Sequence, residues 1–287
     1  MSLPGNLLAR EPDDKLNASL MRITFFGIAI ALASASVASA ESAPARIDLS
    51  QFPAAAIEDV VVPVPSEIFN VLDKLGSPNW KGELRESLGR QSGNRAQVAL
   101  LLGTVIAEGF IAVEAEDSGK VKDIGREVLE LSKAIGVEKA VVARSKAIVD
   151  KAEAKNWPAV RTELDGALQD VRGAMIELND EDLAQLVSLG GWIRGTEVLT
   201  SIVRKDYKPQ RAELLHQPEL LNYFNRQLEN MSPRLRNSQL VSQIQKVLNE
   251  ISPLIIEGEG RKISPESVER INDMTNEVVV SITSADA

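Results

Sequence analysis

Apolar side chains recur every three or four residues from Pro65 to the end of the chain, which is the spacing of amphipathic helices. The first such run, at 68–75, ends at Gly76. The following stretch, 76–94, is rich in Gly, Ser and Asn. It therefore predicts a long connection, with about one helical turn at 83–88.

Two stretches are apolar on nearly all sides and predict the centre of the fold. They cover about 94–116 and 180–204. A helix that is apolar all round is buried on most of its sides. The first stretch is also long enough to be mistaken for a membrane span, but Gln97, Thr104 and Glu108 argue against that interpretation.

Further amphipathic helices are expected at 121–135, 137–152, 158–178, 240–255 and 265–282, with two more starting at Pro209 and Pro218. The spacing at 240–255 continues through Pro253, which predicts a kink rather than an end. Asn179 is expected to cap the helix that follows it. The pattern as a whole predicts an all-α fold without strand pairs, either a multi-helix bundle or a helical-hairpin array of about eight to ten helices.

The N-terminal residues follow a different pattern. Residues 21–40 begin with Arg22, continue through an apolar stretch of about ten residues and end in Ala-Ser-Ala, which is the order of a cleaved signal peptide. We expect cleavage after Ala40 and export to the periplasm or the outside. Residues 1–20 are acidic and basic, and we expect them to be an upstream extension, with translation starting at Met21.

The mature part of the chain then divides into a tether and a body. Four prolines punctuate residues 41–65, which show no helical period. We expect this extended tether to lie along the helical body or to stay mobile, since its Val-Val-Val run is only one strand. Residues 66–287 are expected to form a single helical domain. No later segment predicts a membrane-spanning helix, so the mature protein is expected to be soluble.

Composition excludes several classes of chemistry. The chain of 287 residues carries a net charge of −9 and contains no cysteine. Without cysteine there is no thiolate nucleophile, no cysteine-ligated zinc and no covalently attached haem. The acidic balance argues against nucleic acid as a partner, because phosphate binding requires clustered Lys and Arg. The densest basic stretch, 81–95, is interrupted by glutamates and is expected to be a solvated loop. We expect no cofactor and no metal.

Glu108 and Arg194 are the candidate site residues, because each lies inside one of the two apolar stretches. A charge in such a place is costly unless it has a partner. Three interpretations stay open: a polar patch that binds a small anionic or amide ligand, a buried ion pair between the helices, or a surface pair of Arg194 with Glu197. Thr104 and Trp192 are expected nearby.

Glycines in the second apolar stretch support close packing of the two helices. Gly190, Gly191 and Gly195 each weaken a helix, so close approach of a neighbouring backbone is a plausible compensation. The single histidine, His216, is expected at a helix end as a capping or surface residue. Trp157 and Trp192 are expected to pack in the fold, whereas Trp80 lies in the predicted loop.

These patterns favour three functions in descending order. The first is an exported non-catalytic helical protein that binds or scaffolds a protein partner in the periplasm or cell envelope. The second is a ligand-binding bundle, a sensor or carrier with a polar site between the two apolar helices. The third is an enzyme that uses only carboxylates, for which the sequence singles out no facing pair of acids.

Overall fold

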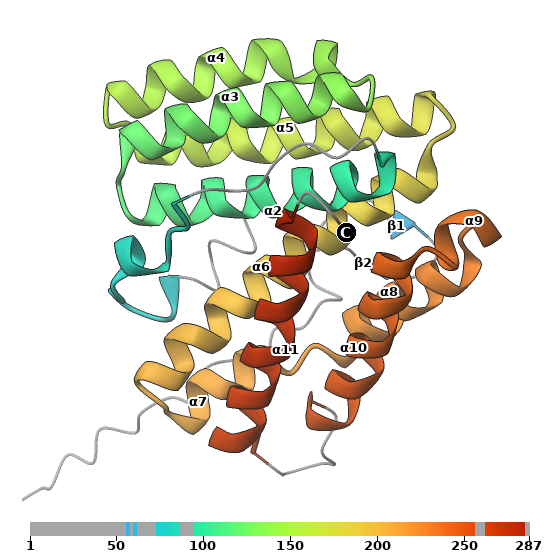
Figure 1. Ribbon diagram of the computed structural model, residues 1–287. Helices are drawn as coiled ribbons and strands as arrows, with labels where there is room; N and C mark the ends of the chain where they lie inside the picture. The colour runs from blue at the N-terminus through green and yellow to red at the C-terminus, as the bar shows by residue number, and fades with distance from the viewer. Residues whose placement is uncertain (1–55, 58–59, 62–72, 87–93, 256–261, 285–287) are drawn as a thin grey trace, which may run out of the picture. The chain divides into compact units, whose positions relative to one another are not determined.

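The computed structural model describes residues 56–57, 60–61, 73–86, 94–255 and 262–284. The chain divides into two units, Met1–Glu41 and Ser42–Ala287, and all described residues belong to the second. This described part is almost entirely helical, with eight α-helices of 13 residues or more (Figure 1). The predicted all-α class is confirmed. The expected signal peptide, the upstream extension and most of the tether lie outside the described residues.

Four successive helices form the first half of the body. They are α2 (Arg95–Glu114), α3 (Ser118–Ala134), α4 (Glu138–Glu153) and α5 (Trp157–Glu177). Each packs against the next, and α5 also returns to contact α2 (Figure 1). The helix bounds agree with the apolar spacing of the sequence to within a few residues.

The connections between these helices share one geometry. A residue with positive φ follows the helix end at Glu116 (51°), Gly136 (86°), Lys155 (56°) and Asn179 (54°). The next residue donates its N–H to the carbonyl five positions back, as in Asp117 to Ala112 at 3.0 Å. This is the Schellman closure, which satisfies carbonyls at the helix end. The same residue begins the next helix, so each connection is only three residues long.

Asn179 therefore differs from its expected role. The residue that starts α6 (Glu181–Lys205) is Asp180, and Asn179 instead takes the left-handed position that ends α5. Asparagine suits this position because its short polar side chain tolerates a positive φ better than most residues. The prediction that Asn179 caps the next helix was wrong by one residue.

The second half of the body is built on α6, which packs against α2 on one side and α11 (Pro265–Thr283) on the other. The elements between them are α7 (Pro209–Ala212), the 3₁₀ turn Glu213–Leu215, α8 (Pro218–Asn230), α9 (Pro233–Arg236) and α10 (Gln239–Ile255). Helix α10 lies between α8 and α11 (Figure 1). Its described residues continue through Pro253 to Ile255, as predicted.

Two local expectations are corrected. Ala56–Ile57 and Val60–Val61 form a small antiparallel pair, with Ala56 opposite Val61. The sequence offered a single apparent strand, and the second was missed because each is only two residues long. In addition, the helical turn expected at 83–88 is a 3₁₀ turn at Trp80–Glu83, where Asn79 caps the N-terminus by accepting from the Gly82 N–H.

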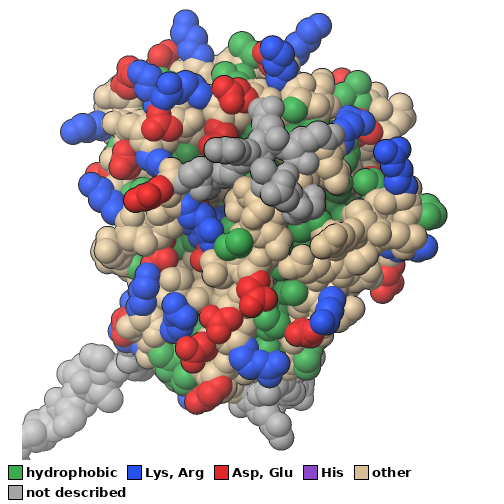
Figure 2. All heavy atoms as spheres, in the orientation of Figure 1, with side chains coloured by type: hydrophobic (Ala, Val, Ile, Leu, Met, Phe, Trp, Pro, Cys, Tyr) green, Lys and Arg blue, Asp and Glu red, His purple; other side chains and the backbone are tan. Residues whose placement is uncertain are grey.

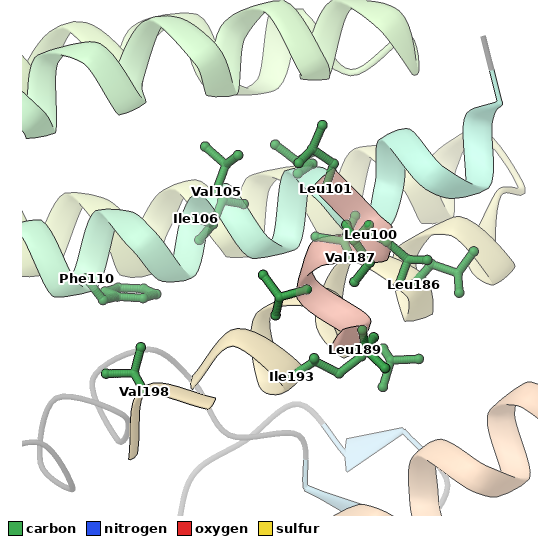
Figure 3. Packing of buried hydrophobic residues seen from close by; sticks show 14 of the residues in the cluster. Leu100, Leu101, Val105, Ile106, Phe110, Leu186, Val187, Leu189, Ile193 and Val198 are labelled. Atoms are coloured by element: carbon green, nitrogen blue, oxygen red, sulfur yellow. The ribbon is translucent and has the colours of Figure 1, made fainter. Parts of the chain in front are cut away.

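Helix α2 is the central element of the described body. All but its terminal residues are buried, and it lies between α3 and α5 on one side and α6 on the other. Figure 3 shows Leu100 of α2 beside Leu186 and Val187 of α6. Among the described helices, α2 alone has the length and apolar composition of a membrane span, and this apolar stretch is entirely buried within the fold. Burial of this kind is typical of a core helix.

Candidate functional site

The contact between α2 and α6 is set by two glycines. A β-carbon at Gly190 would lie 2.1 Å from the carbonyl oxygen of Leu100, and one at Gly103 would lie 1.9 Å from that of Val187. Either distance is impossible for a real side chain, so both glycines are required for the backbones to meet. The prediction that a neighbouring backbone approaches closely therefore holds for Gly190. At Gly195 nothing lies within 4 Å of such an atom, so the prediction is wrong there.

This close approach brings Glu108 and Arg194 together. Nε and Nη2 of Arg194 lie 2.9 and 2.8 Å from Oε2 of Glu108. The Arg194 side chain is 1% exposed and that of Glu108 is 0% exposed. Both nitrogens contact the same carboxylate oxygen, and the contact is a buried charge-assisted pair, in a place where electrostatic attraction is strong.

Glu197 joins the pair from one turn further along α6. Nη1 of Arg194 donates to its carboxylate, and Nη2 of Arg85 lies 3.6 Å from the other carboxylate oxygen. Arg194 therefore contacts both carboxylates that the sequence offered as alternatives, and neither contact is on the surface. Two guanidinium groups and two carboxylates balance in charge, which reduces the cost of burying them.

A short segment that leaves the 3₁₀ turn at Glu83 closes this polar centre from outside the helices. We call residues Glu83–Glu86 the strap. The Arg85 N–H donates to Oε1 of Glu108 at 2.5 Å, and Nη2 of Arg194 donates to the Glu83 carbonyl at 2.5 Å. Nζ of Lys120, at the start of α3, donates to the Arg85 carbonyl at 2.5 Å. We call Glu108, Arg194 and Lys120 the clamp, since together they hold the backbone of the strap.

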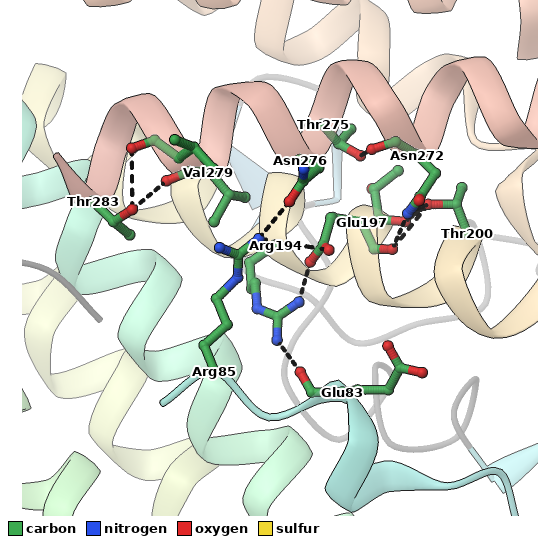
Figure 4. A network of polar contacts seen from close by, with 12 residues as sticks. Glu83, Arg85, Arg194, Glu197, Thr200, Asn272, Thr275, Asn276, Val279 and Thr283 are labelled. Carbon is green, nitrogen blue, oxygen red and sulfur yellow. Dashed lines mark hydrogen bonds and ion pairs between the residues drawn. The ribbon is translucent and has the colours of Figure 1, made fainter. Parts of the chain in front are cut away.

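Helix α11 supports the same centre from its other side (Figure 4). Nη2 of Arg85 donates to Oδ1 of Asn276 at 2.8 Å. Asn272 donates to the carbonyl of Glu197 at 2.9 Å and to Oγ1 of Thr200 at 3.0 Å. The centre thus joins α2, α3, α6, α11 and the strap through polar contacts that fix their relative positions.

Comparison with protein-family models, curated proteins and solved structures found no match. The interpretation of the site therefore depends on its geometry.

The other two predicted site residues are not part of this centre. Thr104 donates to the Leu100 carbonyl within α2 at 3.0 Å. Trp192 donates to Gln217 at 3.2 Å, and its ring centroid lies 5.6 Å from that of Phe224. Thr104 also lies 3.5 Å from the Gly190 carbonyl of α6, and Trp192 joins α6 to the start of α8, so the described hydrogen bonds of both side chains go to groups other than Glu108 and Arg194.

The strap itself was not predicted from sequence. The basic stretch that contains Arg85 was expected to be solvated, and Lys81 and Arg95 are exposed as expected, but the Arg85 side chain is only 22% exposed and ion-paired. Trp80, just before the strap, is only 7% exposed. Hydrogen bonds to backbone atoms leave no pattern in side-chain types, so the only available signal was the proximity of Trp80 and Leu84 to Arg85.

The electrostatic surroundings include one further carboxyl. Burial raises the pKa of Glu127 on α3, while the positive charge of Lys120 opposes that rise and the charges of Glu130 and Glu108 add to it. Within the described ranges, no group of three or more His, Asp or Glu side chains is arranged to hold a metal ion. His216 lies just after the 3₁₀ turn Glu213–Leu215, and its Nδ1 contacts the Ile255 carbonyl of α10 at 2.9 Å.

The Glu108–Arg194 pair holds segments of the chain in place, and its polar atoms are occupied by protein groups. Both carboxylate oxygens of Glu108 and all three side-chain nitrogens of Arg194 contact protein groups. In this state the pair presents no free acid, base or anion-binding group. Its described contacts hold the backbone of the strap.

Proposed function

We propose that this chain is an exported, soluble, non-catalytic helical protein that binds or scaffolds a protein partner in the periplasm or cell envelope. The expected signal peptide at 21–40 directs export, and the extended tether at 41–65 separates it from the body. The absence of cysteine suits a protein whose stability comes from packing rather than from disulfides.

The saturated polar centre is the observation that supports binding over catalysis. A catalytic acid or base has to reach a proton on a substrate, and the Glu108–Arg194 pair is fully occupied by the chain itself. The face drawn in Figure 2 carries basic and acidic side chains interspersed. Such a face favours a protein surface as partner over a polyanion, which is bound by clustered positive charge.

The alternative is a small-molecule sensor or carrier with its site between α2 and α6. The geometry favours it less, because the backbones of the two helices meet at Gly103 and Gly190 and so leave no gap at that level. A ligand would also have to displace the strap to reach Arg194.

Affinity purification tests the two proposals together. The full chain, tagged after Ala287, is expressed in its own host and recovered from the exported fraction, with a version lacking residues 1–40 as an intracellular control. We expect a mature N-terminus at Glu41 and a protein partner at a fixed ratio. A metabolite that co-purifies at one per chain, with no protein partner, would instead support the sensor or carrier.

A further inference from the structure

The clamp recognises the strap mainly through its backbone. Glu108 accepts from the Arg85 N–H, Arg194 donates to the Glu83 carbonyl, and Lys120 donates to the Arg85 carbonyl. Lys120 also lies 3.4 Å from the Glu86 carbonyl. Every peptide provides these groups, except that proline lacks the N–H. Leu84 has φ −70° and ψ 136°, an extended conformation open to any residue.

Side chains of the strap add a pattern to this backbone recognition. The Glu83 carboxylate is only 7% exposed and lies 2.5 Å from Nζ of Lys205. Leu84 is half-buried against the hydrophobic core. Arg85 reaches Asn276 and Glu197. The site is thus complementary to an acidic residue that ends a 3₁₀ turn, then an apolar residue in extended conformation, then a basic residue.

We propose that the clamp is a binding site for an extended peptide segment, filled here by the chain's own strap, and that an acidic–apolar–basic segment of a partner protein takes the same place by displacing it. This inference deepens the proposed function, on which its biological meaning rests. The physical site itself can be tested without knowledge of the partner.

Exchange of the strap for a segment of a partner protein preserves the hydrogen bonds to the clamp. Removing the strap alone would leave the Glu108 carboxylate and the Arg194 guanidinium short of partners in a buried place, which is costly. An incoming backbone restores each of these hydrogen bonds, so exchange avoids that cost. The strap competes at an effective concentration on the order of millimolar, as a tethered segment does. A free peptide should therefore bind the wild-type chain weakly.

The decisive experiment weakens the contacts of the strap and supplies the segment from outside. The variant Arg85→Pro lacks the N–H that donates to Glu108, and it also lacks the side chain that reaches Asn276 and Glu197. The probe is a synthetic peptide of residues 79–86, Asn-Trp-Lys-Gly-Glu-Leu-Arg-Glu, with blocked ends. The control peptide is identical but N-methylated at the Arg85 amide, so it retains every side chain and loses the one donor. Binding is measured by calorimetry on the full mature chain.

We expect the peptide to bind Arg85→Pro at least about tenfold more tightly than wild type, and N-methylation to weaken binding at least about tenfold. Equal binding of the two peptides, equal binding by the two proteins, or no binding to the folded variant would overturn the proposal.

A second variant guards against loss of folding. Glu83→Lys reverses the contact with Lys205 and leaves all three clamp residues intact, so it should loosen the strap and tighten peptide binding in the same way. If Arg85→Pro does not fold, Glu83→Lys takes its place in the binding experiment, and the same three results would overturn the proposal. Peptide binding without any partner in the exported fraction would uphold the clamp and reject the proposed function. A partner without peptide binding would do the reverse.

Discussion

Gly190 of α6 lies against the backbone of Leu100 in α2, at a distance that leaves no room for a side chain. A β-carbon there would stand 2.1 Å from the Leu100 carbonyl oxygen, and it would meet backbone rather than a flexible side chain. The pair fixes how closely the two central helices approach. It also aligns Glu108 with Arg194, because these residues lie further along the same two helices.

The first prediction compares two glycines of α6. Gly190→Ala should lower the free energy of unfolding by about 2–3 kcal/mol, because the helices must separate to admit the methyl group. Gly195→Ala should raise it by about 0.5–1 kcal/mol, because the space is open and alanine is the better helix former. Urea unfolding followed by circular dichroism measures both. Changes of the same sign would contradict the packing described.

The second prediction concerns the buried pair. Glu108→Ala and Arg194→Ala should each cost about 3–5 kcal/mol, because each leaves a buried charge without its main partner. The double variant should cost clearly less than the sum, with a coupling of at least about 1 kcal/mol. The exposed pair Lys122–Glu153 is the matched control, and its coupling energy should be less than about 1 kcal/mol. Additive losses at Glu108 and Arg194 would argue against the pair as a unit.

The third prediction uses the shared geometry of the helix connections. Lys155 has φ 56°, a conformation that glycine adopts without strain, so Lys155→Gly should stabilise the fold by about 0.5–1 kcal/mol. Gly136 has φ 86° and open space around it, so Gly136→Ala should destabilise by about 1 kcal/mol through the backbone alone. Thermal unfolding monitors both variants. A loss of stability in Lys155→Gly would refute the assigned conformation.

The fourth prediction concerns pH and the contact between α4 and α5. Hydrogen bonds from Lys151 and Arg144 lower the pKa of Glu163 from its ordinary value near 4.5. The folded chain therefore binds this proton less readily than the unfolded chain, and the resulting stability is present above that value and lost as pH falls through the lowered pKa. Glu163→Gln should destabilise at pH 7, and its effect should shrink towards zero at strongly acidic pH.

Glu127 provides the opposite control. Burial raises its pKa, so its contribution favours the folded state at acidic pH and is lost as pH rises through the raised value. Glu127→Gln should therefore stabilise the chain at pH 7 and have little effect at acidic pH. If urea titrations from pH 3 to pH 8 gave the two variants the same pH dependence, the assigned environments would be wrong.

Much of the fold could be predicted because it depends on side-chain periodicity. The apolar spacing located α2 to α6, and the same spacing carried α10 through Pro253. Glu108 and Arg194 were found because a charge inside an apolar helix is unusual and calls for a partner. These signals lie in residue type and interval, which the sequence displays directly.

The remainder depends on backbone atoms, which every residue shares. The strap is held by the Arg85 N–H and by the carbonyls of Glu83 and Arg85, so its sequence indicated only a polar loop. Likewise, Gly103 is needed for helix contact and Gly195 is not, although both occur within apolar helices. Only the relative placement of α2 and α6 separates them.

The three-residue connections constrain how this body can change shape. From Arg95 to Lys205 only three residues separate each helix from the next, and these residues are held by backbone hydrogen bonds, so one helix cannot move independently of its neighbours. Tilting any of these helices would unwind the last or first turn of a neighbouring helix. A switch in conformation has to be sought outside this rigid run: in the strap before it, or beyond Lys205, where the short elements Pro209–Ala212 and Glu213–Leu215 precede α8.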